Sequence, residues 1–126
     1  MLVVTRFDVP ADRAAAFLDS AQAALEAFAG RPGFVRGRVG RAADDPSVWV
    51  LTTEWDGVGS YRRSLGAFEV KVSATPLLAQ GRDEASAFEV LRSVEGGQPS
   101  ASASRRAADA DVVGLGEASG PASAEV

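Results

Sequence analysis

Two amino acids with distinctive chemistry, cysteine and histidine, are missing from this chain of 126 residues. The lack of cysteine excludes disulfides, thiolate catalysis and cysteine-held metal or iron–sulfur sites. The lack of histidine removes the commonest base near neutral pH and the commonest metal ligand. Zinc catalysis, a Ser-His-Asp triad and a histidine-ligated heme all need groups that are not here. We therefore expect no bound metal and no cofactor.

Long apolar runs and a basic excess are also missing. No stretch of eighteen apolar residues occurs, so we expect no membrane span. The N-terminal MLVVTRFDV has no basic segment before its apolar run, so it is predicted as a first strand and not a signal peptide, with the cytoplasm as location. The formal net charge is −4 and the pI about 4.8, which argues against a nucleic-acid partner.

The pattern of apolar residues predicts strands and helices in the order β-α-β-β-α-β. The strands are expected at residues 2–9, 34–41, 48–55 and 85–91, and the first helix at 13–29. A second helix should follow Asp56, with Tyr61, Leu65, Phe68 and Val72 on one face, and end at Thr75-Pro76, before a separate short turn. This order predicts an α+β, ferredoxin-like fold: a four-stranded antiparallel sheet with both helices on one face.

The two ends of the chain differ in composition. Residues 1–95 carry the predicted elements and form one domain. Residues 96–126 are mostly Gly, Pro, Ser and Ala and contain no aromatic residue, so they are predicted to be a disordered, low-complexity tail. Within it, the short apolar patch at residues 112–115 has two interpretations, a chance feature of the composition or a docking segment.

The first and third predicted strands are apolar on both faces, and two helices can cover only one of them. Burial of apolar surface contributes roughly 25 cal/mol per Å², so a second face left in water would reduce the stability of the fold by several kcal/mol. That is a large loss against a total stability of ~5–15 kcal/mol. A second copy of the same sheet is the simplest cover.

Four segments carry a resemblance to a known family: the start MLVVTRFDVP, the helix end AGRPGFV, the strand VWVLTTEWDG and the helix opening SYRRSLGAFEV. An apolar strand ending in Glu54-Trp55-Asp56, followed by a helix with an early aromatic residue, is similar to the antibiotic biosynthesis monooxygenase family. The resemblance covers about residues 1–93. It implies a homodimer in which two sheets face each other as a dimeric α/β barrel, each subunit holding a pocket between sheet and helices.

Relatives in this family differ in chemistry. The heme-degrading branch uses an Asn, a Trp and an iron-ligating His at positions that fall here near Arg6, Ser64 and Val72, so it is excluded. The quinol and anthrone oxygenases use neither metal nor flavin, and let the anion of a bound phenol-like substrate reduce O₂. A third group has no settled catalytic role.

Six residues are candidates for such a site. Trp49 and Trp55 share a strand face and are either an aromatic pocket wall or part of the core or the dimer interface. Phe68 is expected on the inner side of the second helix, in the core or against the substrate. Tyr61 could donate its phenol to a substrate oxygen, or be a core tyrosine with an exposed tip.

Two charged residues complete the candidate set. Arg6 lies mid-strand among apolar neighbours and could stabilise an enolate or phenolate, or pair with Asp8 or Glu54. Glu54 is the only carboxylate deep in a predicted strand; it could act as a general base, or as an ion-pair partner.

The sequence thus predicts a cofactor-independent monooxygenase that acts with O₂ on a small aromatic, polyketide- or quinol-like substrate. The alternative is a non-catalytic dimeric module that binds a hydrophobic metabolite or a protein. A cavity of ~300 Å³ or more with converging polar groups would favour the enzyme, and an interior filled by its own Trp and Phe would favour the module.

Overall fold

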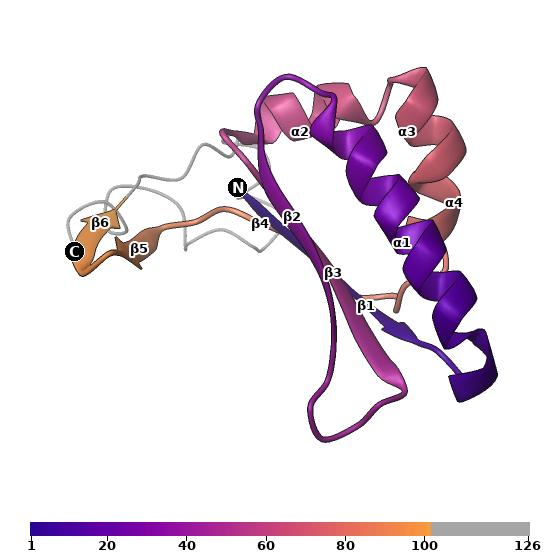
Figure 1. Ribbon diagram of the computed structural model, residues 1–126. Helices are drawn as coiled ribbons and strands as arrows, with labels where there is room; N and C mark the ends of the chain where they lie inside the picture. Colours follow the sequence, from indigo (N-terminus) through magenta and orange to yellow (C-terminus); the bar gives the residue numbers. More distant parts are fainter. Residues whose placement is uncertain (102–126) are drawn as a thin grey trace. The chain divides into compact units, whose positions relative to one another are not determined.

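A computed structural model describes residues 1–101 as two units, the first of which is Met1–Phe88 (Figure 1). Its strands and helices follow the predicted α+β order, with additional short helices. The elements are β1 (Leu2–Asp8), the 3₁₀ turn η1 (Ala11–Arg13), α1 (Ala14–Ala29), β2 (Phe34–Arg41), β3 (Val48–Trp55), α2 (Val58–Ser64), α3 (Phe68–Ser73), α4 (Thr75–Leu78) and β4 (Ala87–Phe88).

The strands form one antiparallel sheet in the order β2-β3-β1-β4, and the helices lie on one face of it (Figure 1). The predicted ferredoxin-like fold is therefore confirmed. The central pair β1 and β3 is in register over its full length, from Leu2 opposite Glu54 to Asp8 opposite Val48. A bulge between Phe34 and Arg36 shifts the register of β2 against β3.

The alternation of side chains along the central strands decides what each face of the sheet presents. On β3, Trp49, Leu51, Thr53 and Trp55 are buried and the residues between them are half-buried. On β1, every second residue from Val3 to Phe7 is buried. These residues meet α1, whose buried stripe is Phe17, Ala21, Ala24 and Phe28. The core thus lies between the sheet and α1.

The predicted second helix is wrong in one respect: two short helices, α2 and α3, replace it, and α4 follows where the prediction had a separate short turn. Gly66 and Ala67 separate α2 from α3, and Ala67 is extended (φ −75°, ψ 143°). The helical phase therefore restarts at Phe68, and the predicted apolar stripe no longer stays on one face. Phe68 is 74% exposed and Val72 57% exposed, whereas Val70 is buried.

The last strand, β4, is much shorter than the predicted 85–91. The segment before it also lies along β1, but it is held there by single backbone hydrogen bonds and by ion pairs. Backbone bonds run from Arg82 N–H to the Arg6 carbonyl (2.8 Å) and from Val4 N–H to the Ser86 carbonyl (2.7 Å). Two ion pairs reinforce them, each with two hydrogen bonds: Arg6 to Glu84 (2.8 and 2.8 Å) and Arg82 to Asp8 (2.7 and 3.2 Å).

The second unit begins at Glu89 and contains an antiparallel hairpin of β5 (Arg92–Glu95) and β6 (Gln98–Ala101). The boundary predicted after residue 95 falls inside this hairpin, so residues 96–101 are a turn and a strand and not part of a structureless tail. Gly96 and Gly97 have positive φ, which permits the tight reversal. Residues 102–126, including the patch at 112–115, lie outside the described residues. No helix within residues 1–101 is long and apolar enough to cross a membrane.

Gly33 should be intolerant of any side chain. Its φ is +88°, and a Cβ there would overlap Ser60 Oγ and Asp56 Oδ1. Gly33→Ala should lower the free energy of unfolding in urea by about 1–3 kcal/mol. Gly30→Ala is the matched control, because Gly30 has φ −77° and the added Cβ would come no closer than 3.8 Å to its nearest neighbour. Equal stability of the two variants would contradict the packing at Gly33.

The ion pairs beside β1 predict a pH dependence. The hydrogen bonds from Arg6 hold the pKa of Glu84 below its ordinary value of 4.5. A carboxyl whose pKa is lower in the folded state stabilises the fold above its unfolded pKa, and this is lost as the pH falls through the folded pKa. The melting temperature of the wild type should therefore be higher than that of Glu84→Gln at pH 7. The difference between the two melting temperatures should disappear below pH 4.5. Asp19→Asn, at an exposed carboxylate on α1, should show a smaller difference; a difference for Glu84→Gln that does not change with pH would contradict the ion pair.

Candidate functional site

Aromatic side chains fill the space between the sheet and α1 near the start of α2. The Trp55 ring packs edge-on against Phe28 (centroids 5.6 Å) and Phe34 (5.4 Å), and contacts Tyr61 (5.7 Å). Its indole N–H donates to Thr53 Oγ1 at 2.9 Å. Trp55 is only 2% exposed, so its contacts are those of a core residue.

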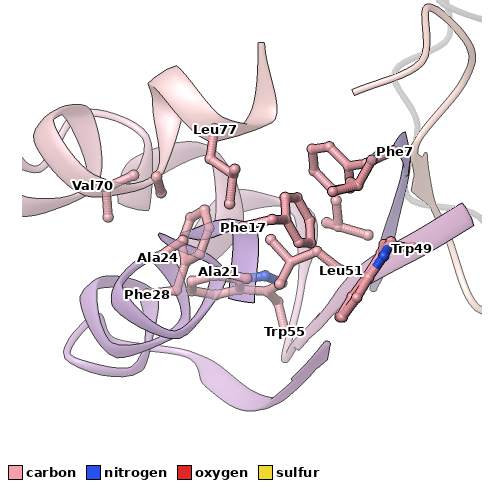
Figure 2. Close-up of a cluster of buried hydrophobic side chains, with 13 residues drawn as sticks. Phe7, Phe17, Ala21, Ala24, Phe28, Trp49, Leu51, Trp55, Val70 and Leu77 are labelled. Atoms are coloured by element: carbon pink, nitrogen blue, oxygen red, sulfur yellow. The ribbon is translucent and has the colours of Figure 1, made fainter. Parts of the chain in front are cut away.

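A second aromatic group occupies the other end of the same layer. The Phe17 ring packs against the rings of Phe7 and Trp49 (Figure 2), and the ring centroids are 4.9 and 5.4 Å away, respectively. The guanidinium of Arg41 lies over the Trp49 ring at 5.4 Å. The Trp49 indole N–H is buried without a hydrogen-bond partner among the described residues. Of the two interpretations of Trp49, the contacts again match core.

Tyr61 is half-buried on α2 and packs against Trp55 and Phe28. Burial raises the pKa of its phenol above the ordinary value of 10, so the hydroxyl keeps its proton at neutral pH. It can therefore donate a hydrogen bond but cannot act as a base. Two serines of the same helix are buried: Ser60 Oγ donates to Asp56 (2.5 Å), and Ser64 Oγ to the Tyr61 carbonyl (2.6 Å).

The structure does not bring the predicted catalytic residues together. Arg6 and Glu54 project from the face of the sheet opposite the helices, which we call the open face, whereas Tyr61 lies on the helix side. Arg6 is opposite Val50 and so four residues from Glu54 along β3, about 13 Å at 3.3 Å per residue. Phe68, predicted as core or pocket wall, points into solvent because of the break at Gly66 and Ala67.

Both charged candidates are held in ion pairs. Arg6 pairs with Glu84 and not with either predicted partner. Glu54 lies 3.8 Å from Arg36 Nε and 4.0 Å from Arg38 Nη1. The ion-pair interpretation of each residue therefore agrees with the contacts, and neither carboxylate nor guanidinium faces a cavity of the helix side.

The helix side does have a groove at its edge, beside the start of α1 and the end of α4. Its volume is about 260 Å³, and its apolar wall consists of Val9, Phe17 and Leu77, all buried. Polar groups come from Asp8, Arg13, Ser20 and Gln80. A second cavity of about 260 Å³ adjoins it along α1 and shares Ser20, Leu77 and Gln80 with it. We call the two together the α1–α4 groove.

The sequence predictions missed this site because its residues are far apart in the chain. Arg13 lies at the N-cap position of α1 and Gln80 follows α4, and only the folded chain places both at one cavity. The recognisable signal was limited: a polar residue at each end of a predicted helix is ordinary. None of the six predicted site residues lines the groove.

Charge within the groove is not balanced. The Asp8 carboxylate accepts two hydrogen bonds from Arg82, which hold its pKa below the ordinary value of 3.8. It is thus ionised and already paired at neutral pH. By contrast, no hydrogen bond or ion pair to another residue of the described part of the chain occupies the Arg13 guanidinium. The groove can therefore accept an anion beside an apolar wall.

Comparison with known proteins finds similar structures and one similar sequence. The chain is 30% identical over 64% of its length to SnoaB, a cofactor-independent oxygenase from Streptomyces nogalater, with a TM-score of 0.56 and 82% of that structure covered. A conserved protein from Methanosarcina mazei shares the fold (TM-score 0.57, 20% identity, 68% of this chain and 84% of that one).

A 42.8 kDa protein of the whiE locus of Streptomyces coelicolor is 30% identical over 98 residues, or 77% of this chain. The chain spans only a quarter (25%) of the length of that relative. The family model described as antibiotic biosynthesis monooxygenase matches residues 1–71, more than half of the 126 residues. This chain therefore belongs to the antibiotic biosynthesis monooxygenase family.

Proposed function

We propose that this protein is a cofactor-independent oxygenase that acts on a small aromatic substrate of the anthrone or quinol type. The observation that carries the proposal is the 30% identity to SnoaB over 64% of this chain, because SnoaB is itself a cofactor-independent oxygenase. Family membership supports it at a coarser level. The absence of histidine and cysteine from the whole sequence is compatible with chemistry that needs no metal held by these residues.

The proposed reaction needs no external reductant. An anthrone carries a CH₂ group whose deprotonation gives an electron-rich enolate. The enolate transfers one electron to O₂, and the two radicals combine into a hydroperoxide. Loss of water then gives the quinone, so that one oxygen atom enters the substrate and the other leaves as water: R₂CH₂ + O₂ → R₂C=O + H₂O. The protein has to favour the anion and exclude side reactions.

One observation favours the second candidate, a binding module without catalysis. Trp49, Trp55 and their phenylalanine neighbours fill the layer between sheet and α1, where the pocket was predicted. Each of the two cavities that make up the α1–α4 groove, at about 260 Å³, is slightly below the ~300 Å³ at which small-molecule pockets begin. In this alternative the groove binds a metabolite that is released unchanged.

Oxygen consumption separates the two functions. With a dihydroxyanthrone and air-saturated buffer containing EDTA, the enzyme should consume one O₂ per anthrone converted to quinone, at least about tenfold faster than the same amount of heat-unfolded protein. No nicotinamide, flavin or metal should be needed. Binding of the anthrone without acceleration over the unfolded control would contradict the oxygenase and favour the binding module.

We also propose that the protein is a homodimer through the open face. Leu2, Val4, Val48 and Val50 alternate with the buried residues of β1 and β3 and are only half-buried in the single chain. Phe88, opposite Leu2, adds a ring that is 45% exposed. A contiguous apolar surface on a sheet is unfavourable in water, and a second copy of the face is self-complementary. The charges on this face lie in ion pairs, which reduces the cost of covering them.

Sedimentation tests the dimer and its face. Wild type at tens of micromolar should sediment at about 26 kDa, twice the chain mass of 13.0 kDa. Val50→Glu places an added carboxylate in the proposed interface, opposite Arg6, whose guanidinium already pairs with Glu84, and should shift the mass toward 13.0 kDa. Leu18→Glu, at an exposed leucine of α1 on the helix side, is the matched control and should stay dimeric. A monomeric wild type, or equal dissociation of both variants, would contradict the proposal.

A further inference from the structure

The α1–α4 groove combines two adjoining cavities with an apolar wall. Its wall is formed by the edges of the core, where Phe17 and Leu77 come from α1 and α4 (Figure 2). Two cavities of about 260 Å³ share Ser20, Leu77 and Gln80, so their long direction follows α1. An apolar wall with few polar groups at defined points is typical of sites for small organic molecules.

The electrostatics of the groove select for a negative charge. Arg13 brings a guanidinium that no other residue within 1–101 engages, while Asp8 is neutralised by Arg82. The first cavity also lies beside the first turns of the sixteen-residue helix α1, through Arg13, Ala16 and Phe17. The N-terminal end of a helix carries partial positive charge, which acts in the same direction as the guanidinium.

We infer that the α1–α4 groove binds a planar fused-ring molecule with an ionised ring oxygen, and that Arg13 pairs with that oxygen. The rings lie against Phe17 and Leu77, and Gln80 is placed to donate its amide N–H to a ring carbonyl. This inference rests on the proposed function, since the anion of an anthrone or quinol is the form that reduces O₂. Arg13 then lowers the pKa of the bound phenol or enol, whose proton leaves to solvent at the open rim of the groove.

Binding of two quinones of similar size tests the charge preference. The probes are 2-hydroxy-1,4-naphthoquinone, an enolate at neutral pH, and 2-methyl-1,4-naphthoquinone, which is neutral; both are already oxidised and cannot turn over. Calorimetry should show tighter binding of the enolate to wild type. Arg13→Gln should lower the affinity for the enolate about tenfold and leave the affinity for the methyl compound within about twofold of that of the wild type. Arg62→Gln, at an exposed arginine of α2, removes the same charge elsewhere and should change neither.

Blocking the groove tests its location. Ala16 and Ala15 are adjacent exposed residues of α1, but only Ala16 lines the groove. Ala16→Phe should lower the affinity for both quinones by about tenfold or more, and Ala15→Phe should change neither affinity. Equal affinities of these two variants, or of Arg13→Gln and Arg62→Gln, would overturn the inference.

Oxygen uptake distinguishes its failure from that of the proposed function. If Ala16→Phe consumes O₂ with the dihydroxyanthrone as fast as Ala15→Phe, the groove is not the substrate site although the oxygenase is real. If the quinones bind as described but wild type does not accelerate O₂ uptake, the groove stands as an anion site and the oxygenase function fails.

Discussion

Packing of large aromatic side chains between the central strands and α1 is the constraint on which the rest of this structure depends. Trp49 and Trp55 stand on the same face of β3 and meet Phe17 and Phe28 of α1. These contacts hold the helix on the sheet and leave the layer between them filled. Buried aromatic residues contribute large areas, and truncating one to alanine typically costs about 3–5 kcal/mol. A substrate site within this layer would require losing that packing.

Two consequences follow for where the molecule can act. The first is that a ligand on the helix side has to use the edge of the layer, where Val9, Phe17 and Leu77 are still apolar but Arg13 and Gln80 reach solvent. The second is that the helices are committed to one face, so the half-buried Val4 and Val50 on the other have no cover within the described unit. The packing of the helices on one face of the sheet thus leaves two separate surfaces, the groove at the edge of the helix side and the open face.

The proposed reaction rests on similarity to a known oxygenase, because the geometry of the groove does not identify a reaction by itself. The likeness to SnoaB, a cofactor-independent oxygenase, covers 64% of this chain and supports the proposed reaction between an aromatic anion and O₂. Such a reaction makes modest demands on side chains: a positive group near the developing charge and an apolar wall against the rings. Arg13 and Phe17 satisfy both, and the ion-paired Arg6 and Glu54 of the open face do not.

The predictable part of the fold was the part set by local alternation and periodicity. Strands β2 and β3 begin and end at the predicted residues, because each has turn-forming residues at its boundaries. Phe68 and Val72 were misplaced because a spacing of four, three and four residues specifies a face only while the helix is continuous. A Gly-Ala pair was enough to interrupt it and bring Val70 inward.

The site was less predictable than the fold for a different physical reason. Arg6 is unusual in the sequence because it lies among apolar residues, yet its partner Glu84 is brought to it only by the chain segment after α4. Arg13 looks ordinary in the sequence, and only the folded chain shows that no other residue within 1–101 engages its guanidinium. Side-chain type showed which chemistry was available, but contacts between distant segments decided which groups were left free to perform it.

A crystal structure with 2-hydroxy-1,4-naphthoquinone bound is the most direct test of the proposed groove and dimer, because it shows ligand position and subunit arrangement together. The rings should lie against Phe17 and Leu77, with the ionised oxygen within hydrogen-bond distance of the Arg13 guanidinium. Rings inserted between Trp49 and Trp55 in a rearranged core, or bound on the open face beside Arg6 and Glu54, would contradict it.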